Sequence, residues 1–208
     1  AVDIAQRAPL GFLHHHTDSL VVAFKVPLHG PEDPRLGGNA VQLAADIAKL
    51  LAVMSGKICD NVILYNFDTD IQKFHFTTRN GIISTTMAIP TRGGGTDITL
   101  PLRKMISEKI KADRLIILSD NEINYCWNIS GGHWYSPVRT ESCQTYADKY
   151  RAEVNKDLWV HAIDLRGYGT QQFIGAKTNI IAGWSEKLLE EMGTKYVGVA
   201  NCNREFEG

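Results

Sequence analysis

Short apolar runs alternate along the chain with amphipathic stretches. The apolar runs are rich in β-branched and aromatic residues and have the length of strands; they cover residues 19–26, 61–67, 114–118, 158–165 and 179–182. Residues 72–77 alternate between apolar and polar side chains, which predicts an edge strand. Stretches with helical character cover residues 39–54, about 97–110, 140–154 and 185–192. Strands that alternate with helices predict an α/β fold: a Rossmann-like, mostly parallel sheet with helices on both faces.

The clearest helical pattern lies in residues 39–54. Its apolar side chains recur at three- and four-residue spacing and form one stripe: Ala40, Leu43, Ala44, Ile47, Leu50 and Leu51. Asn39 is a typical N-cap residue and Gly56 a typical helix-stop residue, so we expect a helix from Asn39 to about Met54. Pro101 suits the first turn of the next helix, which follows a glycine-rich loop.

The apolar run before Asp120 is the centre of the predicted site. It stops abruptly at four polar residues: Ser119, Asp120, Asn121 and Glu122. This pattern is typical of a strand buried on both faces that delivers a carboxylate to the carboxyl edge of a parallel sheet. Ligands bind at that edge in open α/β sheets. We expect the segment after the first strand and the loop of residues 93–97 to reach the same edge.

The composition is that of an ordinary globular protein. The chain has 208 residues, 44% hydrophobic and 22% charged, and its net charge of -1 gives no signal for nucleic acid or an anionic membrane. No apolar run approaches the ~20 residues that cross a bilayer. We expect one domain at residues 19–208, preceded by residues 1–18 as the tail of an upstream region. The four cysteines form no C-x-x-C pair, which argues against zinc and disulfides and favours the cytoplasm.

The loops at the predicted edge carry oxygen donors. Thr96 supplies a hydroxyl, and Asp97, Asp120 and Glu122 supply carboxylates, a set that suits Mg²⁺ or Mn²⁺ better than zinc. Thr96 is equally an N-cap candidate, and Asp97 and Glu122 are equally capping or solvated groups. The sequence has no G-x-S-x-G elbow, no P-loop and no set of nucleophile and base. We therefore expect a binding protein, not an enzyme.

Three further stretches are open to a binding or a packing interpretation. The aromatic residues of the loop at 122–138 suit stacking on unpaired bases, docking of a protein partner, or packing on their own domain: Tyr125, Trp127, Trp134 and Tyr135. Residues 166–171 place glycines on both sides of Tyr168, as in a binding loop or a packed turn. The histidines at 14–16 indicate a surface loop, with metal ligation as the alternative.

Several motifs together resemble the von Willebrand factor A (vWA) domain, in the form found in TROVE-module proteins such as the Ro autoantigen and its bacterial relatives. The matching segments are residues 94–97 (Gly-Gly-Thr-Asp), 118–122 (Leu-Ser-Asp-Asn-Glu), 163–170 and 181–185, together with the strand and turn at 61–70. With these segments in this order, the resemblance covers nearly the whole chain. The resemblance implies a vWA fold with a metal-ion-dependent adhesion site at the carboxyl edge, where Thr96 and Asp120 match the loop threonine and the later aspartate of the family.

The first strand departs from the family pattern. Where the family has D-x-S-x-S, this chain has Lys25 in place of the aspartate, and Pro27 and His29 in place of the serines. Thr96 and Asp120 are then the surviving metal ligands, and two oxygens are too few for a divalent cation that prefers about six. We hypothesise that the Lys25 ammonium lies near Asp120 and takes over the role of the cation. No cofactor is then expected, with retained Mg²⁺ or Mn²⁺ binding as the alternative.

The resemblance implies a non-catalytic binding module of a Ro-like RNA-binding protein, concerned with noncoding RNA binding or quality control. Its partners would be a protein or a ring of helical repeats, and small noncoding RNA, with no DNA and no membrane. The alternative is a stand-alone protein–protein interaction domain whose edge recognises a partner carboxylate through Lys25. A hydrolase built on Asp120 and His29 is a third hypothesis.

Overall fold

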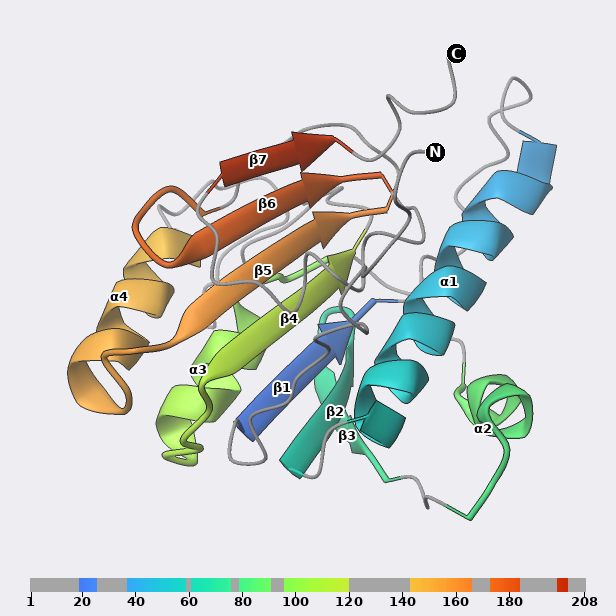
Figure 1. Ribbon diagram of the computed structural model, residues 1–208, viewed down its shortest axis with the longest axis horizontal. Helices are drawn as coiled ribbons and strands as arrows, with labels where there is room; N and C mark the ends of the chain where they lie inside the picture. The colour runs from blue at the N-terminus through green and yellow to red at the C-terminus, as the bar shows by residue number, and fades with distance from the viewer. Residues whose placement is uncertain are drawn as a thin grey trace, which may run out of the picture.

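A seven-stranded sheet forms the centre of the molecule (Figure 1). The computed structural model describes residues 19–25, 37–58, 61–75, 79–90, 96–119, 143–165, 173–183 and 198–201. The strands lie in the order β3-β2-β1-β4-β5-β6-β7. Their bounds are β1 Ser19–Phe24, β2 Asn61–Phe67, β3 Ile71–Phe74, β4 Arg114–Ser119, β5 Trp159–Asp164, β6 Thr178–Ala182 and β7 Gly198–Asn201. Neighbouring strands are parallel, except that β3 runs antiparallel to β2.

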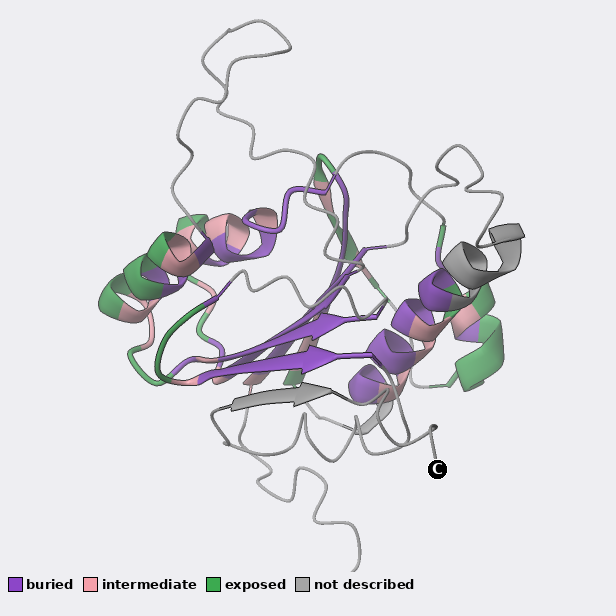
Figure 2. Ribbon diagram, turned by 90° about the horizontal axis from the view of Figure 1, so that it is seen from above, coloured by how far each residue is buried: buried purple, intermediate pink, exposed green. Residues whose placement is uncertain are grey.

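Helices cover both faces of the sheet (Figures 1 and 2). On one face lies α1 (Gly37–Ile58), against which the short helix α2 (Ile82–Ala88) packs. On the opposite face lie α3 (Leu100–Ser107) and α4 (Cys143–Glu153), which contact one another. The buried sides of α1 and α4 face the sheet in Figure 2.

The sheet is apolar on both faces, and β4 shows why. All six of its residues are buried, as expected for a central strand of a parallel sheet. Ile116 and Leu118 belong to the core beneath α1, whereas Leu115 and Ile117 belong to the core beneath α3 and α4. Successive side chains of a strand point to opposite faces, so one apolar run serves both cores. The predicted fold class, a mostly parallel α/β sheet with helices on both faces, is confirmed.

The predicted strands are confirmed as β1, β2, β4, β5 and β6, with small differences at their ends. The predicted edge strand at 72–77 is observed as β3 (Ile71–Phe74). Pro101 lies in the first turn of α3, as predicted. The predicted helix at 140–154 is described from Cys143 to Glu153.

The predicted ends of α1 were wrong. The helix begins at Gly37, before Asn39, so Asn39 lies inside the first turn and is not the N-cap. Gly56 does not stop the helix, which continues to Ile58. Gly56 is buried, and Ser55 Oγ donates a 2.8 Å hydrogen bond to the Leu51 carbonyl. Packing of this last turn outweighs the low intrinsic helix propensity of glycine, which costs about 1 kcal/mol.

The helix predicted to reach Ile110 ends earlier, at Ser107. Lys109 has φ 52°, a left-handed conformation that no helix residue adopts. The Ile110 N–H then bonds to the Met105 carbonyl at 3.0 Å, which closes the end of α3. The chain thus turns sharply into β4.

Two elements were not predicted from the sequence, α2 and β7. In α2, the hydroxyls of Ser84 and Thr85 donate to the Gly81 carbonyl, and the hydroxyl of Thr86 donates to the Ile82 carbonyl. Large apolar side chains of α2 remain exposed. Its sequence therefore lacks the apolar stripe from which a helix packed on the sheet can be predicted. β7 is short and pairs with β6 at the sheet's end.

Some predictions lie outside the described residues. These are the N-terminal segment at 1–18, the aromatic loop at 122–138, the loop at 166–171 and the helix at 185–192. None of the helices in the described part of the chain is long and apolar enough to span a lipid bilayer.

Candidate functional site

The parallel strands bring their last residues to one edge of the sheet. Phe24 at the end of β1 lies opposite Leu118 of β4, and Ser119 at the end of β4 lies opposite Asp164 of β5. Polar residues that follow or end these strands therefore emerge together, at the edge where α/β sheets bind ligands. We define the carboxyl edge as Lys25, Asp68, Asp70, Ser119 and Asp164, which end or follow strands, together with Thr96 and Asp97, which lie before α3 and bond to Lys25 and to the Asp68 carbonyl.

Lys25 and Thr96 meet at this edge. Lys25 directly follows β1, and its backbone N–H donates a 2.9 Å hydrogen bond to the Leu118 carbonyl, which extends the pairing with β4. Its side-chain Nζ donates a hydrogen bond to Thr96 Oγ1. Lys25 is 4% exposed and Thr96 has no exposed surface. The contact joins residues 71 positions apart in the chain, so the segment before α3 is held against the end of β1.

Asp97 organises the start of α3. Its Oδ1 accepts a 3.0 Å bond from the Thr99 backbone N–H and a 2.6 Å bond from the Thr99 hydroxyl. Its Oδ2 lies 3.4 Å from Arg103 Nη1. The Asp97 backbone N–H donates to the Asp68 carbonyl at 2.9 Å, which ties this segment to the turn after β2. The N-cap of α3 is Thr99, so the N-cap role predicted as an alternative for Thr96 is wrong. The Asp97 carboxylate closes the turn before the helix by accepting two bonds from Thr99, and its contact with a ligand stays a prediction.

Asp68 and Asp164 bring buried carboxylates to the edge and were not among the predicted site residues. Asp68 is 5% exposed and its Oδ1 accepts a 2.8 Å bond from the Asp70 N–H, which closes the turn after β2. Asp164 ends β5 and has no exposed surface, and its backbone carbonyl accepts the Gly183 N–H at 2.7 Å. The signal for both was present in the sequence, since each follows an apolar run just as Asp120 does.

Asp120 and Glu122 lie outside the described residues, as do Pro27, His29 and the glycines at 93–95. The described neighbour of Asp120 is Ser119, which is fully buried at the end of β4. The Ser119 carbonyl accepts the Leu165 N–H at 2.9 Å. The hypothesis that Lys25 lies near Asp120 therefore stays a prediction.

The described donors at this edge do not fit a divalent cation. Thr96 Oγ1, the described oxygen of the predicted metal pair, accepts a hydrogen bond from the Lys25 ammonium. A cation at that oxygen would lie against a positive charge, and charges of like sign at contact distance repel. Within the described residues, no group of three or more histidine, cysteine, aspartate or glutamate side chains has metal-binding geometry.

A second polar cluster, not predicted from the sequence, lies inside the sheet on β4, β5 and β6. His161 has no exposed surface, and Asn179 Nδ2 lies 3.1 Å from His161 Nδ1 across the pairing of β5 with β6. Burial, and to a lesser extent the charge of Arg114, lowers the pKa of His161 to about 3. The imidazole is therefore neutral at neutral pH. The ring of Trp159 is stacked on it, with centroids 6.5 Å apart.

The fold has a counterpart among known structures. No family model matches the chain, and a search of curated proteins finds no relative. The crystal structure of the Deinococcus radiodurans Ro (RSR) protein superposes with a TM-score of 0.60 at 16% sequence identity, over 86% of this chain. The matched region is 34% of the Deinococcus chain, so this chain spans about a third of its length. The superposition confirms the predicted fold, a Rossmann-like α/β domain of the vWA type.

Proposed function

We propose that this chain is a non-catalytic binding module of a Ro-like RNA-binding protein. The observation that carries the proposal is the shared fold with the Deinococcus Ro protein over 86% of the chain. The motif resemblance at residues 94–97 and 118–122 points independently to the same family. In this role the domain docks a protein partner or a ring of helical repeats, and the assembly binds small noncoding RNA.

The geometry of the carboxyl edge favours binding over catalysis. A lysine next to a hydroxyl is also the arrangement of Ser–Lys hydrolases, in which the amine activates the nucleophile. Thr96, however, has no exposed surface, so a substrate carbonyl cannot approach its Oγ1. Asp97 is likewise occupied by the backbone and hydroxyl of Thr99. Bonds of this kind fix the shape of a surface, which is what a recognition module needs.

The proposal is tested by recovering RNA with the full-length protein from its native host. A tagged copy is crosslinked in cells, and the bound RNA is sequenced beside that recovered with an unrelated tagged protein. We expect structured small noncoding RNAs to be enriched. Recovery of no RNA above the control would refute the proposal.

A salt series then separates direct from indirect binding. In filter-binding assays with the recovered RNA, direct phosphate contacts give a steep fall of affinity with salt, with a slope of about −0.9 per phosphate on a double-stranded region. If this domain only docks the RNA-binding part, the isolated domain shows no binding even at low salt. The assembly then retains the RNA.

A stand-alone protein-interaction domain is the second candidate, and one observation favours it. On α2, Ile83 is 65% exposed and Met87, one turn further along, is 80% exposed. Exposed apolar side chains that lie together mark protein-binding surfaces more often than chance. Under this alternative, the crosslinked complex contains a protein partner and no RNA.

A further inference from the structure

We propose that Lys25 is a built-in substitute for a divalent cation at the carboxyl edge. The charge that holds the edge together is then part of the chain, and the edge assembles without metal. The inference concerns how the edge is built and does not depend on the proposed RNA-related function.

The first step is that the position of Lys25 is fixed by the sheet. Its backbone N–H bonds to the Leu118 carbonyl at 2.9 Å, so the residue continues the ladder between β1 and β4. Its side chain is 4% exposed. The Nζ is therefore held in the interior of the edge and does not sample solvent like a surface lysine.

The second step is the identity of the acceptor. Nζ donates to Thr96 Oγ1, and Thr96 is the residue that the vWA resemblance assigns as a metal ligand. An ammonium and a divalent cation both need oxygen acceptors, so the two compete for the same oxygen. A metal cannot bind to Thr96 in this arrangement unless Lys25 leaves.

The third step is the charge of the surroundings. Asp68, Asp97 and Asp164 are each at most 5% exposed, and they come from three different segments of the edge. Buried carboxylates need a nearby cation or several hydrogen bonds to remain ionised. Arg103 pairs with Asp97 from α3, its Nη1 3.4 Å from Oδ2, whereas Lys25 is the cation that the described chain places directly on Thr96 at the end of β1. It supplies the positive charge that a metal ion would otherwise bring.

The geometry therefore makes a gain-of-function experiment decisive. Lys25→Asp removes the ammonium from Thr96 Oγ1 and adds a carboxylate at the same place. We expect this variant to bind Mg²⁺ or Mn²⁺, with a Tm that rises by about 5–10 °C at a metal concentration about 100 times Kd. EDTA should reverse the rise. The wild-type Tm should be the same with metal and with EDTA.

Three further variants identify the cause. Lys25→Met removes the charge without adding an oxygen, so its Tm should fall and should not respond to metal. The double variant Lys25→Asp, Thr96→Val should lose the metal response of Lys25→Asp, because it lacks the threonine oxygen. Lys49→Asp is the matched control, since Lys49 is also buried, at 6% exposed, but lies in the middle of α1. It should show no metal response.

Two results would overturn the proposal. One is a wild-type Tm that rises with Mn²⁺ and falls with EDTA, since Lys25 would then not exclude the metal. The other is a folded Lys25→Asp variant that gives no metal response by thermal melting or by isothermal titration. If Lys25→Asp does not fold, the neutral Lys25→Asn variant takes its place, with a weaker response expected. RNA and protein partners are absent from all these measurements, so their outcome is separate from that of the proposed function.

Discussion

Asn179 Nδ2 lies 3.1 Å from His161 Nδ1 in the interior of the sheet, where β5 pairs with β6. If the amide N–H donates, Nδ1 is the acceptor and Nε2 carries the proton of the neutral ring. Within the described ranges of the chain, His161 Nε2 and Asn179 Oδ1 meet no hydrogen-bond partner. Burial of these two atoms costs free energy, and a charge on the imidazole would add a larger cost. The fold therefore favours the uncharged ring.

The first prediction is that His161 makes the protein sensitive to acid. Its pKa is about 3 in the folded state, against 6.5 for an ordinary histidine. Below pH about 6.5 the unfolded chain takes up a proton that the folded protein does not bind, so the free energy of unfolding falls as the pH drops towards 3. His161→Gln should make this dependence shallower by about 1.4 kcal/mol per pH unit within that window.

Urea unfolding at a series of pH values measures this slope. His75→Gln is the control, because the His75 side chain is already exposed to solvent in the folded protein. It should keep the wild-type slope. An unchanged slope in His161→Gln would mean that the folded protein accommodates the charged imidazole.

The second prediction concerns Tyr150, whose hydroxyl fastens the connection between α3 and β4. It accepts a 2.8 Å bond from the Ala112 backbone N–H and donates a 2.8 Å bond to the Ile110 carbonyl. Tyr150→Phe keeps the buried ring but leaves both backbone groups without this partner. We expect the free energy of unfolding to fall by about 1–3 kcal/mol in urea denaturation.

Ser107→Ala is the control for Tyr150→Phe. It removes an exposed hydroxyl that donates to the Lys104 carbonyl at 3.0 Å, and water can replace that bond. Its effect should stay within about 0.5 kcal/mol. An equal fall in the free energy of unfolding in the two variants would show that the buried Tyr150 hydroxyl contributes no more than an exposed one.

The fold was predictable because burial on both faces leaves a direct mark in the sequence. Every residue of β4 is buried, and its four central residues, 115–118, form an unbroken apolar run. α2 leaves no such mark, because Ile83 and Met87 are exposed and the helix depends on side-chain bonds to its own backbone and on contact with α1. The end of α1 was predicted wrongly at Gly56, because tertiary packing there outweighs the low helix propensity of glycine.

The site was predictable only in part. Counting residues past the first apolar run places Lys25 at the carboxyl edge, but its bond to Thr96 joins positions 71 residues apart. One sequence does not contain the register and loop path that produce such a contact. The same holds for His161 and Asn179, which become neighbours only through the pairing of β5 with β6. Neither residue stands out in a strand-like run.

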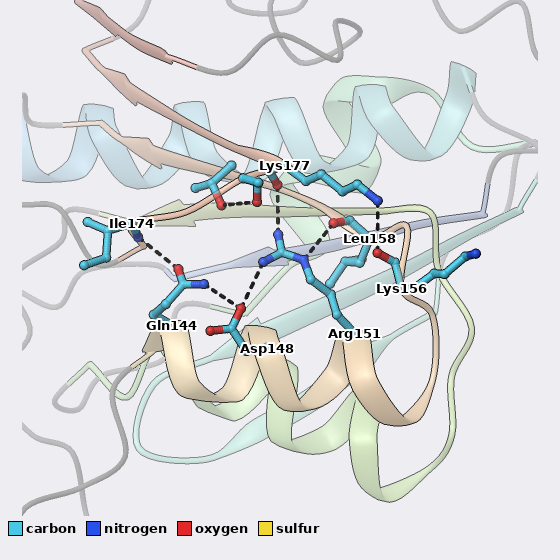
Figure 3. A network of polar contacts seen from close by, with 9 residues as sticks. Gln144, Asp148, Arg151, Lys156, Leu158, Ile174 and Lys177 are labelled. Atoms are coloured by element: carbon cyan, nitrogen blue, oxygen red, sulfur yellow. Dashed lines mark hydrogen bonds and ion pairs between the residues drawn. The ribbon is translucent and has the colours of Figure 1, made fainter.

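The third prediction concerns Arg151, which connects α4 to the strands β5 and β6 (Figure 3). Its Nε donates to the Leu158 carbonyl at 3.2 Å and its Nη2 donates to the Lys177 carbonyl at 2.9 Å, while Nη1 lies 3.4 Å from Asp148. Burial lowers the pKa of Arg151 from its usual value. Arg151→Met should therefore lower the free energy of unfolding by about 1–3 kcal/mol, since two backbone carbonyls lose a charged donor.

Lys177→Met provides the comparison for Arg151→Met. The Lys177 Nζ lies 2.7 Å from Asp157, but the two side chains are 35% and 62% exposed. An ion pair in that setting contributes about 0–1 kcal/mol. The loss in Arg151→Met should exceed the loss in Lys177→Met when both are measured by urea denaturation. The reverse order would contradict the role of Arg151 as the connection between α4 and the sheet.

The last prediction separates two roles for Asp97: it either stabilises the start of α3 or contacts a ligand. Asp97→Ala removes the acceptor of the Thr99 N–H at 3.0 Å and of the Thr99 hydroxyl at 2.6 Å, and both residues are 3% exposed. The free energy of unfolding should fall by about 1–3 kcal/mol, because a buried donor is left unpaired. Asp97→Asn keeps an acceptor oxygen, so its free energy of unfolding should fall less.

If Asp97 instead contacts a ligand, Asp97→Asn would abolish binding of the partner while leaving the urea midpoint unchanged. A large loss of stability in Asp97→Ala, with partner binding retained in Asp97→Asn, would identify Asp97 as part of the scaffold that holds Thr96 beside Lys25.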